Sequence, residues 1–166
     1  MLKNLDKKTD IKSDEKHNIS VNLLDLAGML SLSVDLMEDG VYHHGQRVAY
    51  IAFRLFEELC PGKDAFDLVL ASFLHDIGID SDEKKKEAWN FIVDDYILAK
   101  HTKDGEKLLS QVDLLKDIKS IVKHHHTLYR DIPNINKETV PIEAQVISIS
   151  DRVEVSIDPN QYILSQ

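Results

Sequence analysis

The chain has 166 residues, of which 43% are hydrophobic and 30% charged, so it supports one globular domain and excludes a large multidomain enzyme. Its formal net charge of −9 argues against a nucleic-acid partner held by nonspecific basic contacts. The single cysteine, Cys60, permits no internal disulfide. Neither a signal peptide nor an uncharged apolar run of about 18 residues is present, so we expect a cytoplasmic protein that does not contact a membrane.

Residues 1–18 are dominated by Lys, Asp and Glu without an apolar period, which predicts a charged tail or linker before a domain at 19–166. Ser20 is expected to cap a first helix whose apolar positions run from Leu23 to Val34 and which stops at Asp39-Gly40. A second apolar stripe, spaced three and four apart from Val48 to Leu59, predicts the next helix.

Asp64 is expected to cap a third helix, which carries His75 and Asp76 on its last turn. A helical or irregular stretch then ends near His101, and shorter helices are expected at 104–110 and 113–126. Pro141 suits the first turn of a final helix, whose inward residues are expected to be Ile142, Val146, Ile149, Val153 and Ile157.

No strand pattern competes with these helices, so the predicted fold class is all-α. Apolar residues still follow at Tyr162, Ile163 and Leu164, and we therefore expect the natural protein to continue beyond Gln166.

Histidines are concentrated at the expected helix ends and connecting loops, apart from His17 in the charged tail. Helix ends bring side chains of several helices to a common centre, and imidazole with carboxylate is the ligand set of Fe, Mn, Co, Ni or Zn. The candidate metal ligands are His44, His75, Asp76, His101, His125, His126 and Asp151.

The adjacent pair His75-Asp76 closes an otherwise apolar helix. A carboxylate in an apolar shell costs several kcal/mol unless it is paired, hydrogen-bonded or coordinated, so a metal ion would satisfy both side chains. A His-Asp hydrogen bond without a metal explains this dipeptide equally well.

Three consecutive histidines, 124–126, raise a question of helical register. His125 lies four and three residues after Ile121 and Val122, and His126 lies four after Val122, so both are expected to point inward. His124 falls on the polar face and is expected to be a solvated side chain.

Together these motifs, in this order from about Leu23 to Asp158, resemble the HD superfamily of metal-dependent phosphohydrolases, and more narrowly the HD-GYP group. The resemblance implies an all-helical bundle with a metal centre at the helix ends. It also implies that His44, rather than His43, binds a first metal together with His75, Asp76 and Asp151. Asp76 would bridge to a second metal held by His101, His125 and His126.

Two transition-metal ions, Fe or Mn in first place, would share a hydroxide that attacks a phosphodiester of a nucleotide. Asp76 and His75 would be the catalytic residues, while Arg47 and Arg130 are candidates for phosphate contacts. Cyclic di-GMP is the first substrate to consider. Other domains of a longer chain are expected as partners, and a nucleic acid is not.

Three positions depart from the HD-GYP pattern. Ile79 stands where that group has Lys, Thr127 replaces an acidic residue, and Asp131-Ile132-Pro133 occupies the place of Gly-Tyr-Pro. The departures leave two alternatives open: a phosphatase of linear or dinucleoside phosphates, and a degenerate HD module that binds a nucleotide or a protein without turnover. Gly40, four residues before His44, makes a third metal unexpected.

Overall fold

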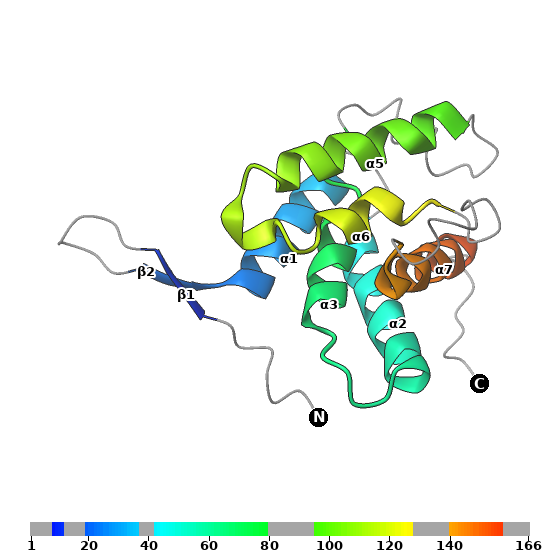
Figure 1. The fold of residues 1–166 in the computed structure, drawn as a ribbon, viewed down its shortest axis with the longest axis horizontal. Coiled ribbons are helices and arrows are strands. Elements are labelled where there is room, and N and C mark those ends of the chain that lie inside the picture. The colour runs from blue at the N-terminus through cyan, green and yellow to red at the C-terminus, as the bar shows by residue number, and fades with distance from the viewer. Residues whose placement is uncertain (1–7, 12–18, 37–41, 80–94, 128–139, 158–166) are drawn as a thin grey trace.

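The computed structural model describes residues 8–11, 19–36, 42–79, 95–127 and 140–157. Within these ranges the chain is mostly helical (Figure 1), which confirms the all-α prediction for the body of the molecule. None of the helices described is long and apolar enough to cross a membrane. The elements are, in chain order, β1 (Lys8–Ile11), β2 (Ile19–Asn22), α1 (Leu23–Asp35), α2 (His44–Leu59), α3 (Phe66–Leu74), α5 (Asp95–Leu109), the 3-10 helix η1 (Asp113–Leu115), α6 (Lys119–His124) and α7 (Ile142–Ser156).

An antiparallel hairpin of β1 and β2 precedes the helices, with Thr9 opposite Val21 and Asp10 opposite Ser20. The sequence predicts no strand here and a charged tail over 1–18, which is wrong for 8–11. Figure 1 shows the hairpin projecting from the helical body. Asn22, and not Ser20, caps α1, because its Oδ1 accepts a hydrogen bond of 2.9 Å from the backbone N–H of Leu24.

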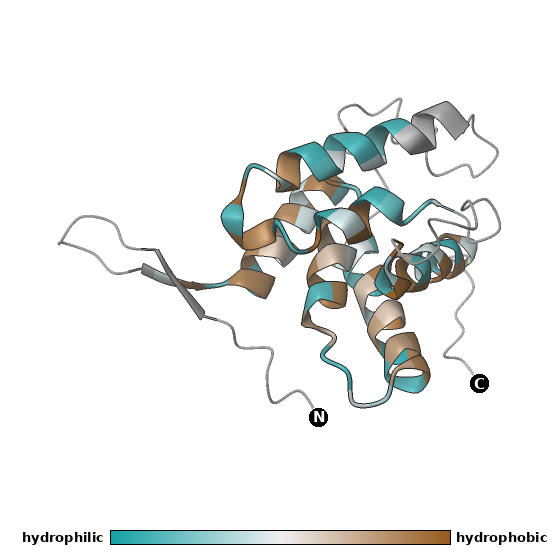
Figure 2. Ribbon diagram, in the orientation of Figure 1, coloured by the Kyte–Doolittle hydropathy of each residue, from teal (hydrophilic) through white to brown (hydrophobic). Residues whose placement is uncertain are grey.

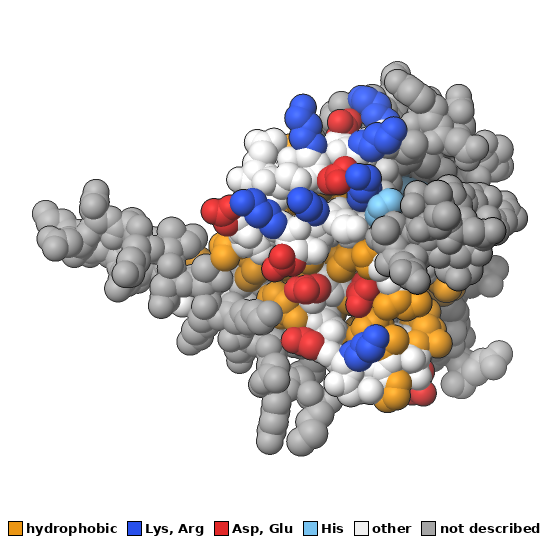
Figure 3. Space-filling model, in the orientation of Figure 1, with side chains coloured by type: hydrophobic (Ala, Val, Ile, Leu, Met, Phe, Trp, Pro, Cys, Tyr) orange, Lys and Arg blue, Asp and Glu red, His pale blue; other side chains and the backbone are white. Residues whose placement is uncertain are grey.

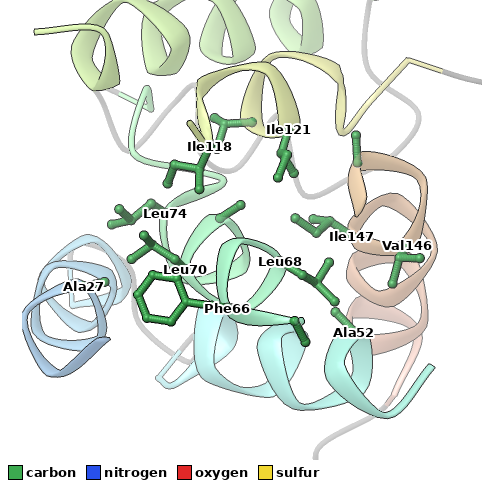
Figure 4. Close-up of a cluster of buried hydrophobic side chains, with 14 of the residues drawn as sticks. Ala27, Ala52, Phe66, Leu68, Leu70, Leu74, Ile118, Ile121, Val146 and Ile147 are labelled. Carbon is green, nitrogen blue, oxygen red and sulfur yellow. The ribbon is translucent and has the colours of Figure 1, made fainter. Parts of the chain in front are cut away.

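Helix α3 lies at the centre of the bundle, in contact with α1, α2, α6 and α7. Its buried residues occur on almost every side, and Leu68, Leu70 and Leu74 are each 1% exposed. Figure 4 shows these side chains meeting apolar residues of α6 and α7, and Figure 2 shows that the coloured part of α5, in contrast, is largely hydrophilic. Fully burying a Leu is worth about 1.5–3 kcal/mol, so this helix anchors whatever follows it. The N-cap of this helix is Ala65 and not Asp64 as expected, but Asp64 Oδ1, one residue earlier, accepts a 2.9 Å hydrogen bond from the N–H of Phe66.

Helix α5 is continuous through His101, which lies within it and not at a helix end, contrary to prediction. Over 100–109 the buried residues of this helix are His101, Thr102, Gly105 and Leu109, so the apolar period that marks most helices is almost absent from that part. The helix expected at 113–126 is divided between η1 and α6. Helix α3 is also shorter than predicted, since it ends at Leu74 and leaves His75 as its C-cap.

Helix α7 begins after Pro141 as predicted, but it turns a different face to the core. Of the five residues expected to point inward, only Val146 is buried; Ile142, Ile149, Val153 and Ile157 are each at least 42% exposed. The buried face is instead built from residues that include polar ones: Ala144, Val146, Ile147, Ser148, Ser150, Asp151 and Glu154. Val146 and Ile147 thus share the buried face with polar residues of the centre, while the other large aliphatic residues lie on the exposed side.

A close contact between two glycines seats the segment after α3 against α5. A Cβ at Gly78 would lie 2.1 Å from the backbone oxygen of His101 and 2.5 Å from the backbone nitrogen of Gly105. Gly105 in turn packs beside Val122 of α6. Glycine at position 78 therefore allows the backbone after Asp76 to approach the helix that carries His101.

Replacement of Gly78 by Ala is expected to lower the free energy of unfolding by about 1–3 kcal/mol or more, because the obstructing atoms belong to the backbone and cannot rotate away. Urea unfolding monitored by circular dichroism measures this change. Gly28→Ala in α1 is the matched control, since a Cβ there would meet only Phe73 Cε1 of α3, at 4.0 Å. This variant should be as stable as the wild type, or more stable by up to about 1 kcal/mol. Equal unfolding midpoints for the two variants would contradict the contact.

Candidate metal centre

All seven predicted ligands lie in described parts of the chain, and the structure brings them together from five helical segments. His44 opens α2, His75 and Asp76 follow α3, His101 lies in α5, His125 and His126 follow α6, and Asp151 lies in α7. They form two adjoining groups in which the candidate ligand atoms are all within 4.8 Å of one another. The first group is His44, His75 and Asp151, and the second is Asp76, His101, His125 and His126.

The first group is compact and buried. His44 Nε2 lies 3.4 Å from His75 Nε2 and 3.4 Å from Asp151 Oδ1, and His75 Nε2 lies 3.9 Å from the same oxygen. The two histidines are at most 2% exposed and Asp151 is 6% exposed. Two imidazole nitrogens and one carboxylate oxygen thus converge on a point that water hardly reaches.

The second group is arranged in the same way around α5 and α6. His101 Nε2 lies 3.3 Å from His125 Nε2, and the His126 ring lies 4.1 Å from that of His125 between centroids. His124 is not in the group; its Nδ1 lies 3.3 Å from Thr127 Oγ1, and its side chain is half-buried rather than solvated. On the face in Figure 3, lysines gather over α5 and α6 while little histidine surface is visible.

Asp76 faces both groups, one carboxylate oxygen to each. Its Oδ2 lies 3.1 Å from His75 Nε2 and 3.8 Å from His44 Nε2. Its Oδ1 lies 3.6 Å from His101 Nε2 and 3.9 Å from His125 Nε2. A carboxylate in this position is able to bridge two cations.

Hydrogen bonds at Nδ1 orient several of the imidazole rings. His75 Nδ1 donates to the Ser72 carbonyl at 2.8 Å, and His125 Nδ1 donates to the Val122 carbonyl at 2.7 Å. In the neutral ring, a proton on Nδ1 leaves a lone pair on Nε2. The Nε2 atoms then point their lone pairs into the centre, as a metal ligand must.

Burial and charge divide the two groups. Burial opposes a positive charge on His75, but the carboxylates of Asp76 and Asp151 outweigh it and raise its pKa to about 10. Burial and the neighbouring His101 lower the pKa of His126 to about 4. The pKa of Asp76 is held well below its usual range, because its histidine neighbours outweigh the effect of burial. Near neutral pH Asp76 is therefore ionised and His126 neutral, which are the forms that bind a metal, whereas His75 carries a proton that a metal ion would have to displace from Nε2.

Two buried acidic residues at or beside the centre were not among the residues predicted from the sequence. Glu154 is 6% exposed and its Oε2 accepts a 2.5 Å hydrogen bond from His44 Nδ1. Asp35 is 3% exposed and lines a pocket beside His44, Gly45 and Asp76. The signals were present, because Glu154 lies three residues after Asp151 on one helix face and Asp35 lies four after the buried Ser31.

The predicted phosphate contacts are only partly described. Arg47 is about half exposed, and its Nε lies 2.5 Å from Glu154 Oε1. Its guanidinium also donates to the carbonyl of Tyr42. Arg130 and the segment Asp131-Ile132-Pro133 lie outside the described residues. Ile79, at the position where HD-GYP members have Lys, is 8% exposed and packs inside.

The donor set fits borderline transition metals. It consists of imidazole nitrogens and carboxylate oxygens without a thiolate, which suits Fe, Mn, Co or Zn. With Asp76 shared, each group offers four protein ligands, which is enough for a tetrahedral ion and leaves positions on an octahedral one. His75 and His44, with lone pairs 3.4 Å apart, are compatible only with a cation or a proton between them.

A family model described as HD domain matches residues 41–156, more than half of the chain. No curated protein and no solved structure matches the chain. HD domains are generally those of metal-dependent hydrolases, and the His and Asp groups found here are compatible with a metal site. Because the matched region contains every residue of both groups, the chain belongs to the HD domain family.

Proposed function

We propose that this protein is a metal-dependent phosphohydrolase that cleaves a phosphodiester in a nucleotide. The observation that supports this most is Asp76, whose two oxygens face two separate groups of imidazole nitrogens. Two cations held by these groups would supply an ionised water at neutral pH and positive charge for phosphoryl oxygens. Iron and manganese are the metals we assign first.

The chain's own residues do the rest of the work. Asp76 holds both halves of the centre in register, and His75, fixed through Ser72, presents Nε2 beside it. The first group and the His101–His125 pair are buried, while Asp76 and His126 are partly exposed; low access of water strengthens electrostatic interactions with a bound phosphate. No side chain is required as a nucleophile.

A cyclic dinucleotide is the first substrate that we propose, and linear or dinucleoside phosphates are the second. Ile79 favours a specificity different from that of HD-GYP enzymes, since a buried aliphatic side chain offers no cation to a phosphate. The metal-loaded protein is expected to hydrolyse at least one member of a panel of cyclic, linear and dinucleoside phosphates. Chromatography of the reaction products measures this hydrolysis. Metal-loaded protein that binds a nucleotide but turns over no member of the panel would instead support an HD module without catalysis.

Asp76→Ala is expected to abolish hydrolysis and to lower the occupancy of both metals, because one carboxylate serves the two groups. Metal content by atomic emission and turnover of the panel substrate measure the two effects. Asp113→Ala is the matched control, since its side chain is 88% exposed in η1 and its ion pair with Lys116 lies at the surface. Loss of only one metal from the Asp76 variant would exclude the bridging role.

The register of the triple histidine gives a separate prediction. Replacing His125 or His126 by Ala should remove a ligand of the second group and release one metal, while the metal at the first group is retained. His124→Ala should keep both metals and turnover within a few-fold of the wild type, because its side chain lies outside the group. The opposite pattern, a metal lost with His124→Ala and none with His126→Ala, would require the ligand pair to be His124 and His125.

A further inference from the structure

Glu154 is a buried acid that occupies neither group of candidate ligands. Both of its oxygens are engaged. Oε2 lies 2.5 Å from His44 Nδ1 and Oε1 lies 2.5 Å from Arg47 Nε. Because the nitrogen of His44 that it contacts is Nδ1, Glu154 lies behind the ring, on the side away from Asp151 and His75.

At His44 the Nδ1 atom contacts a carboxylate, whereas at His75 and His125 it contacts a main-chain carbonyl. His75 and His125 donate Nδ1–H to main-chain carbonyls three residues earlier, so local backbone orients them. His44 Nδ1 instead donates to the carboxylate of Glu154, which lies on another helix and 110 residues away in the chain. A carboxylate behind a ligating imidazole fixes the tautomer and makes Nε2 a stronger donor.

Arg47 completes this arrangement from the same helix as His44. It lies three residues later in α2, and its guanidinium holds the second oxygen of Glu154 and the carbonyl of Tyr42. Burial opposes the ionised form of Glu154, but His44 and Arg47 outweigh burial and lower its pKa. The short path from Tyr42 through Arg47 and Glu154 to His44 therefore joins the start of α2 to α7.

We propose that Glu154 is the positioning residue of the first metal group: it holds His44 with Nε2 toward His75 and Asp151, and Arg47 holds Glu154 in place. This inference rests on the metal binding that the proposed function requires. It adds a residue that binds neither the metal nor the substrate but sets the affinity of one of the two groups. Removal of Glu154 should therefore weaken metal binding at the first group alone.

Mn²⁺ titration followed by electron paramagnetic resonance tests the proposal without any substrate. His126→Ala leaves the first group as the site that remains, and His44→Ala leaves the second. Glu154→Gln keeps the size of the side chain but removes its charge, so added to His126→Ala it should weaken Mn²⁺ binding about 10–100-fold. Added to His44→Ala it should change the affinity less than twofold.

Glu143→Gln is the matched control, the same chemical change in the first turn of α7, and should leave both affinities unchanged. Arg47→Gln is a second variant for the case that Glu154→Gln does not fold, since Arg47 is about half exposed. It should weaken Mn²⁺ binding severalfold, again at the first group alone.

An unchanged first-group affinity in the Glu154 variant, or an equal loss at both groups, would overturn the positioning role. A wild-type protein that binds no Mn²⁺ would overturn it together with the proposed function. A wild-type protein that binds Mn²⁺ as described but hydrolyses no nucleotide would contradict the proposed function and leave the role of Glu154 intact.

Discussion

The carboxylate of Asp76 lies among imidazole rings from four different helical segments, and the rest of the centre is arranged around it. A buried carboxylate without compensation costs several kcal/mol, and its histidine neighbours compete with one another for protons because each is buried. Divalent cations would resolve this conflict in a way that single protons do not, since they would satisfy Asp76 and several lone pairs at once. The two groups of ligands are a direct consequence of that constraint.

The helical bundle supplies the precision that such a centre needs. Helix α3 is buried on nearly all sides, so His75 and Asp76 leave its end from a fixed point. Gly78 then brings the chain against α5, next to the backbone of His101. Glu154 joins α7 to α2 through His44, so the apolar core and the polar centre hold the same helices together.

The sequence alone was sufficient to predict the helical fold class and the seven residues that the structure brings together. Those residues were found from the order and spacing of His and Asp, which do not depend on an apolar pattern. It was insufficient for α5 and for the inward face of α7, where burial of His101, Thr102, Asp151 and Glu154 hides the hydrophobic period. It also missed the β1–β2 pairing, since the charged composition of 8–11 masks a hairpin that depends on main-chain hydrogen bonds. The contact of Glu154 with His44 could not be predicted, because the two residues are 110 positions apart and the sequence does not show that they meet.

Two metal ions are expected to lie on either side of the Asp76 carboxylate. Anomalous diffraction at the manganese edge, from crystals grown with Mn²⁺, tests it directly. We expect two peaks per chain, about 3.5–4 Å apart. One should lie between Asp76 Oδ2 and the His44–His75 pair, and the other between Oδ1 and the His101–His125 pair. A single peak, or two peaks that do not share Asp76, would contradict it.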